Sequence, residues 1–147
     1  MSTEPLKSWR TARIGEIPAA GLSGGPDYWK EWTDDEGYAA RWHSVREHLG
    51  IEAFGVNACH REAGEEVVVT HDEASFGGQE ELYAVVEGRV RFTCDGEQVE
   101  LGPGELLFLP PQVQRAGTAL ETPTTVLMIG GVAGKPYEPD WEPDASS

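Results

Sequence analysis

Turn-forming residues recur at short intervals through the second part of this chain, and their spacing limits the fold more than any other feature. Between the turns lie short segments rich in β-branched and aromatic residues, which are typical of strands. These segments run over residues 53–59, 66–70, 82–86, 90–94, 98–101, 105–109 and 124–129 of the 147-residue chain. At least seven short strands joined by such turns predict an all-β, antiparallel sandwich or barrel.

The turns contain residues whose backbone chemistry suits tight corners. Asp95-Gly96 is a strong hairpin signal. Gly88 and Gly104 lie at other expected corners, where glycine adopts a positive φ without steric cost. Pro110-Pro111 ends a strand, because proline cannot donate a hydrogen bond to a neighbouring strand. These residues specify the fold and carry little chemistry.

The first part of the chain differs from the rest in composition. Apolar residues recur there at helical spacing and a helix-ending glycine follows them: Tyr38, Trp42, Val45, Leu49 and Gly50. This pattern predicts one amphipathic helix packed on the sheet. The same part holds four of the five tryptophans, namely Trp9, Trp29, Trp32 and Trp42. We expect them to pack against the core, since large aromatic side chains cover core edges well.

The length of the chain is that of one domain. We divide it into an N-terminal extension over residues 1–50, a β-barrel over residues 51–134 and an acidic tail over residues 135–147. The tail is expected to lie as an extended strap over the barrel, with Trp141 as its anchor.

Charge excludes two classes of partner. The chain has 11 basic and 26 acidic residues, for a formal net charge of −15. Such a surface repels phosphate backbones and anionic lipid headgroups alike. We therefore expect no nucleic-acid partner and no membrane partner, and no apolar run approaches the ~20 residues that span a bilayer.

The two cysteines do not have metal-binding spacing. Cys59 and Cys94 lie in segments that alternate like strands, and we read them as buried thiols. A disulfide between neighbouring strands is the alternative. The N-terminus lacks the apolar core of a signal peptide, so a cytoplasmic location is expected.

Two segments in one register resemble the two conserved motifs of the cupin superfamily. They are Glu80-Glu-Leu-Tyr-Ala-Val-Val-Glu-Gly88 and Gly104-Glu-Leu-Leu-Phe-Leu-Pro110. The likeness extends roughly over residues 54–131, and the whole pattern is similar to small, single-domain cupins of actinobacteria. The resemblance implies a cupin-type antiparallel β-barrel, the jelly roll or double-stranded β-helix, with a helix-bearing N-terminal extension.

The ligand positions depart from that family. The resemblance implies a divalent metal held by three histidines and one glutamate. Read back from the glutamate of the first motif, the histidine pair falls on Ala74 and Phe76, or on Ser75 and Gly77. The histidine of the second motif is Arg115, which has no lone pair to offer and opposes a cation.

One alignment restores a partial metal set. A loop before the first motif that is longer than usual would bring His71 and Glu73 into the place of the missing histidines, beside Glu81. One imidazole and two carboxylates are ligands for Mn, Fe or Zn, although Arg115 would compete for the carboxylates. The resulting hypothesis is a metal-dependent cupin oxygenase.

The same residues also support chemistry without a metal. Arg115 would pair with Glu81 or Glu73, or bind a carboxylate or other anion of a small ligand. Tyr83 and His71 would add a phenol and an imidazole for general acid–base work. By resemblance, this is an isomerase-like or epimerase-like activity, with His71, Glu81, Tyr83 and Arg115 as catalytic candidates.

Binding without catalysis is a further possibility. Gln79, Phe92 and Arg115 are candidate ligand contacts at the barrel mouth. An enzyme would present an apolar pocket on which the polar candidates converge. A ligand sensor or a structural homodimer would instead pair Arg115 with Glu81 and fill the cavity with Phe76 and Phe92. A homodimer is expected by resemblance in either case.

Overall fold

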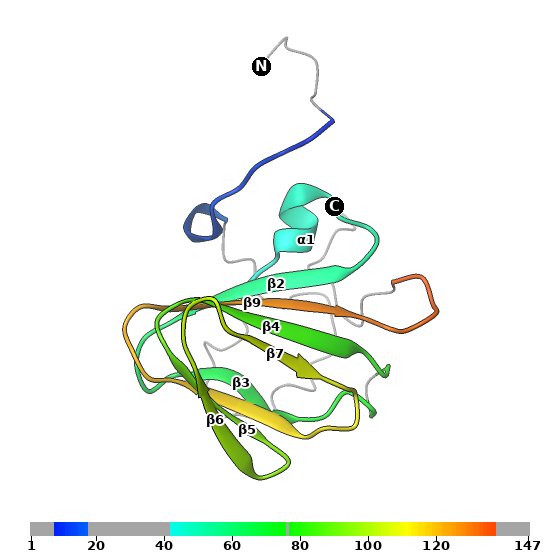
Figure 1. The fold of residues 1–147 in the computed structure, drawn as a ribbon. Coiled ribbons are helices and arrows are strands. Elements are labelled where there is room, and N and C mark those ends of the chain that lie inside the picture. Colours follow the sequence, from blue (N-terminus) through cyan, green and yellow to red (C-terminus); the bar gives the residue numbers. More distant parts are fainter. Residues whose placement is uncertain (1–7, 18–41, 76, 138–147) are drawn as a thin grey trace.

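The computed structural model describes residues 8–17, 42–75 and 77–137. Its strands form two antiparallel sheets that face each other (Figure 1). One sheet has the order β1 (Trp42–His43), β2 (Gly55–Arg61), β9 (Thr124–Gly131), β4 (Glu80–Glu87) and β7 (Leu106–Leu109). The other has the order β3 (Glu66–His71), β8 (Arg115–Ala119), β5 (Val90–Cys94) and β6 (Glu97–Leu101). The all-β prediction is confirmed as a jelly-roll sandwich, with two sheets in the described residues where a barrel was expected.

Alternation along the strands decides which side chains reach the core between the sheets. On β4, Tyr83 and Val85 are each 2% exposed, whereas Val86 is 49% exposed. The register places Tyr83 beside Met128 of β9 and Leu107 of β7. The core contains Cys59, Val67, Val68, Tyr83, Val85, Val90, Phe92, Leu101, Leu109, Ala119, Val126 and Met128. Both sheets contribute to it, so burial of this surface holds them together.

The hairpin corners are those the sequence predicts. Asp95 and Gly96 join β5 to β6 with φ values of 49° and 86°, the paired positive φ of a tight hairpin turn. Gly88, between β4 and β5, has φ 80°, and a Cβ there would collide with Thr124 and the carbonyl of Pro123. Glycine is required at that corner for both conformation and space.

The N-terminal part covers the outer face of the larger sheet. Helix α1 (Val45–Leu49) lies over β2 (Figure 1), and a 3₁₀ turn (Ile14–Glu16) precedes it in the chain. Val45 packs with Ile17 against Val56 of β2 in a second apolar cluster. Among the described residues, this cluster thus covers outward-facing side chains of β2 and β9.

The predicted helix is shorter than expected. Trp42 was placed on it, but Trp42 lies in β1 and pairs with Cys59. The helix begins after Ser44, whose hydroxyl caps it by accepting a hydrogen bond from the Glu47 amide. Gly50 ends it with φ 74°, as predicted.

The aromatic residues that were expected to pack against the core can be tested only in part. Trp9 is 63% exposed, so its predicted packing against the core is wrong. Tyr38, Trp29, Trp32, Phe76 and Trp141 lie outside the described residues. Strand β8, which begins at Arg115, is absent from the predicted strands.

Neither Cys59, which is buried, nor Cys94, which is partly buried, forms a disulfide among the described residues, and burial raises the pKa of the Cys94 thiol. Among the described residues, no helix has the length and apolar character needed to cross a membrane.

Candidate functional site

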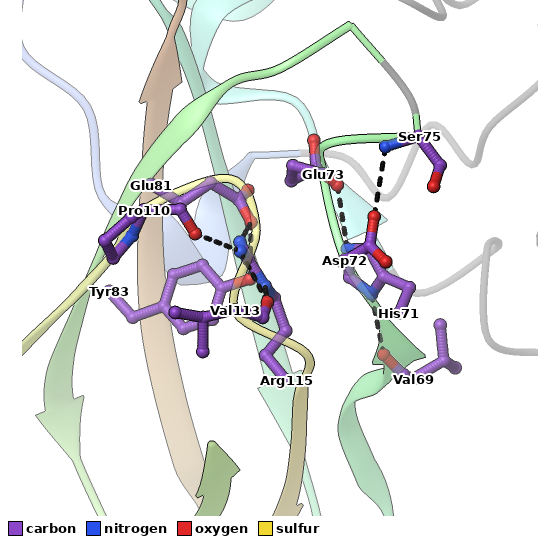
Figure 2. A network of polar contacts seen from close by, with 10 residues as sticks. All are labelled: Val69, His71, Asp72, Glu73, Ser75, Glu81, Tyr83, Pro110, Val113 and Arg115. Carbon is purple, nitrogen blue, oxygen red and sulfur yellow. Dashed lines mark hydrogen bonds and ion pairs between the residues drawn. The ribbon is translucent and has the colours of Figure 1, made fainter. Parts of the chain in front are cut away.

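A buried arginine forms the centre of the polar cluster. The Arg115 side chain is 0% exposed and lies at the start of β8. Its Nη1 donates to Oε1 of Glu81 at 2.6 Å, and the Tyr83 hydroxyl donates to the same oxygen at 2.8 Å (Figure 2). Glu81 and Tyr83 are two residues apart on β4, so alternation brings both to the inner face.

Backbone carbonyls hold the rest of the guanidinium. Nη2 of Arg115 donates to the carbonyls of Pro110 at 2.9 Å and Val113 at 3.0 Å, and Nε donates to Val113 at 3.2 Å. The loop between β7 and β8 therefore wraps around this side chain (Figure 2). A charge-assisted pair with such additional acceptors can be buried without leaving donors unsatisfied.

The protonation states in this cluster follow from its contacts. Burial and the charge of Glu81 raise the pKa of Tyr83 well above its usual range, so the phenol remains a donor. Burial works against the charge of Arg115, but the influence of Tyr83 and Glu81 outweighs it and raises the arginine pKa. Tyr83 and Arg115 therefore act as fixed donors to Glu81.

His71 and Glu73 form a second pair beside the first. His71 Nε2 lies 2.9 Å from Oε2 of Glu73, and Nδ1 lies 2.7 Å from the carbonyl of Val69. Because both ring nitrogens face acceptors, the ring must carry a proton on each while Glu73 is ionised. Burial opposes this charge, but the hydrogen bonds to Glu73 and Val69 and the charges of Glu73 and Glu81 outweigh it. The pKa of His71 is therefore above its ordinary 6.5.

The loop that follows β3 holds Glu73 in place. The amides of Glu73 and Ala74 both donate to the carbonyl of Pro111 at 2.9 Å. Asp72 accepts from the Ser75 amide at 3.0 Å, and this backbone hydrogen bond lowers the pKa of Asp72. The loop thus brings Glu73 to His71, as predicted from the longer loop.

A pocket of about 420 Å³ has Glu81 in its wall. Its walls combine apolar side chains with two carboxylates and a glycine-rich segment: Phe54, Glu80, Glu81, Leu82, Phe108, Ile129, Gly130, Gly131, Val132 and Ala133. His71 and Arg115 do not line it. An enzyme was expected to present the polar candidates together in one pocket, and of these Glu81 is the one that lines this pocket.

Phe92 and Gln79, the two other predicted ligand contacts, lie in different surroundings. Phe92 is fully buried, with its ring 5.7 Å from that of Tyr83, so it supports the site from within the core. Gln79 is 9% exposed and adjoins Gly130 at the pocket wall. Sequence reasoning missed the carbonyls of Pro110 and Val113, since backbone acceptors leave no residue signal.

Comparison with known families identifies the fold. Residues 73–130 match the family described as the cupin domain. The chain carries a cupin domain. A comparison with curated proteins finds no match.

Solved structures give the same result for this cupin domain. A cupin protein from Bacteroides fragilis matches with 28% identity and a TM-score of 0.56, over 64% of this chain and 78% of that one. KdgF from Halomonas matches with 18% identity and a TM-score of 0.55, over 80% and 96% of the two chains. A sugar phosphate isomerase from Silicibacter pomeroyi matches with 22% identity and a TM-score of 0.51, over 60% and 57%.

The cupin family implies a metal, and the donor residues can be tested for it. His71, Glu73 and Glu81 each offer a ligand atom, and these atoms lie within 4.8 Å of one another, which confirms the predicted grouping. However, His71 Nε2 is engaged by Glu73, and Glu81 Oε1 by Arg115 and Tyr83. As arranged, with a guanidinium among them, these side chains do not fit a divalent cation.

Proposed function

We propose that this cupin domain binds a small organic molecule in the pocket beside Glu81. The observation that carries the proposal is that Glu81 belongs both to the pocket wall and to the buried polar cluster. A ligand in the pocket would therefore lie against Glu81, whose carboxylate is held by Arg115 and Tyr83. Concave, mostly apolar pockets with a few oriented polar groups are typical of small-molecule sites.

The lining indicates the chemistry of the ligand. Phe54, Phe108 and Ile129 favour an apolar body, while Glu80 and Glu81 favour a group that donates hydrogen bonds. The nitrogens of Arg115 already donate to Glu81, Pro110 and Val113. We therefore propose a hydroxyl- or amino-bearing ligand in preference to the anion expected from sequence.

Acid–base catalysis is the second candidate function. It is supported by the raised pKa of His71, whose Nε2 faces Glu73, since an imidazole that holds its proton beside a carboxylate is a common acid–base pair. Such a role fits an isomerase, the activity stated for the Silicibacter pomeroyi protein, whose likeness at 22% identity supports the fold alone. Deuterium uptake into a bound sugar in D₂O, followed by NMR, would detect the proton transfer, and His71→Gln should abolish it.

The binding proposal is tested by ligand-observed NMR with a set of hydroxyl- and amino-bearing metabolites, followed by calorimetry on those that bind. Phe108→Ala should weaken binding by about tenfold or more, because it removes an apolar wall of the pocket. Val99→Ala, which removes a 38% exposed apolar side chain on the other sheet, is the matched control. Equal binding by both variants would contradict the proposed site.

A further inference from the structure

Strand pairing brings a permanent cation to the metal-donor group. In the β3–β8 register, His71 and Arg115 are direct partners, so their side chains share one face. Arg115 Nη1 lies 2.6 Å from Glu81, and Glu81 has a ligand atom within 4.8 Å of those of His71 and Glu73. A fixed positive charge is thus bonded to one member of the donor group.

We infer that Arg115 is the resident cation of this site and keeps divalent metals out of it. The guanidinium engages the Glu81 carboxylate that a metal would need, and it repels a second cation at short range. Its bonds to the carbonyls of Pro110 and Val113, and its complete burial, keep it from moving aside. This inference goes beyond the proposed ligand site, because it does not depend on which ligand binds.

The arrangement also defines a latent metal site. Replacing Arg115 with histidine removes the charge and puts an imidazole beside His71 on the same face of the sandwich. The donor group would then have two imidazoles and the carboxylates of Glu73 and Glu81. Imidazole and carboxylate are ligands for Zn²⁺ and Mn²⁺. One substitution should therefore convert a metal-excluding site into a metal-binding one.

The experiment titrates ZnCl₂ into the full-length, chelator-treated protein by calorimetry, for wild type, Arg115→His and Arg115→Gln. Circular dichroism establishes that each variant is folded. Arg115→Gln is the matched control, since it removes the charge without adding an imidazole ligand. Arg115→His combined with His71→Gln reports whether zinc binds at this site or at other surface groups.

We expect Arg115→His to bind about one equivalent of zinc at least about a hundredfold more tightly than wild type. Arg115→Gln should bind more weakly than Arg115→His, and the double variant should lose the gain. Wild-type zinc binding within tenfold of folded Arg115→His would overturn the inference, as would absence of binding by folded Arg115→His. If neither variant folds, the zinc titration of the wild-type protein tests the inference. A single micromolar zinc site that is lost in Glu81→Gln would overturn the inference, and the absence of such a site in wild type would support it.

Discussion

Replacing Glu81 with glutamine would leave the buried guanidinium of Arg115 charged among neutral partners. Arg115 is 0% exposed and the Glu81 side chain only 17%, so solvent does little to compensate the charge. Removing one partner of a buried ion pair costs about 3–5 kcal/mol. The amide oxygen of glutamine still accepts a hydrogen bond, which recovers about 1 kcal/mol. We expect the free energy of unfolding to fall by about 2–4 kcal/mol, and the melting temperature by about 6–12 °C.

Urea denaturation followed by circular dichroism measures this change. The control is Glu100→Gln, which breaks the exposed pair with Arg89, where the atoms are 3.8 Å apart and both side chains are nearly half exposed. That pair should contribute less than about 1 kcal/mol. If Glu81→Gln costs no more than Glu100→Gln, the pair is not a stabilising element and the reasoning on Arg115 is wrong.

Three further predictions concern pH, turn geometry and assembly. The folded-state pKa of His71 is raised, so its contribution to stability is complete below the unfolded pKa of about 6.5 and is lost as pH rises through the folded pKa. The unfolding free energy lost in His71→Gln should therefore be larger at about pH 5.5 than at about pH 8.5, and a pH-independent difference would contradict this assignment. Gly88→Ala should destabilise by at least about 2 kcal/mol more than Gly96→Ala in the same assay, because both have positive φ but only the first would collide with Thr124. The homodimer stays a prediction, and light scattering tests it: Leu106→Lys on the edge strand β7, where Leu106 is 60% exposed, should yield monomers if that face forms the interface.

The fold was largely predictable because its turns have explicit chemistry. Asp95-Gly96 and Gly88 mark their corners through backbone conformations that few residues adopt. Strand β8 was missed for the opposite reason. Arg115-Ala-Gly-Thr-Ala119 has little β-forming character, and Gly117 is there because the Phe92 ring lies 3.0 Å from where its Cβ would be. Such a packing requirement appears only when distant strands are brought together.

Which residues form the site was easier to predict than how those residues pair with one another. Alternation along β4 and the longer loop after β3 brought Glu81, His71 and Glu73 together as expected. The sequence left open whether Arg115 pairs with Glu81, pairs with Glu73 or binds an anion of a ligand. Burial of Arg115 depends on the carbonyls of Pro110 and Val113, because they accept hydrogen bonds from the guanidinium and so offset the cost of removing it from water. Backbone acceptors of this kind are created by the path of a loop, whatever its residues.

Because Arg115 is held by backbone carbonyls, the site acquires its positive charge during folding, without a separate step that loads a metal. Its central positive charge is synthesised with the polypeptide and is in position as soon as β4, β8 and the loop before β8 have folded. No chelator can strip it, no competing ion can exchange with it, and no oxidant can change its valence. If Arg115 excludes metals as proposed, a chelator in the growth medium or buffer should leave the yield and the melting temperature of the protein unchanged.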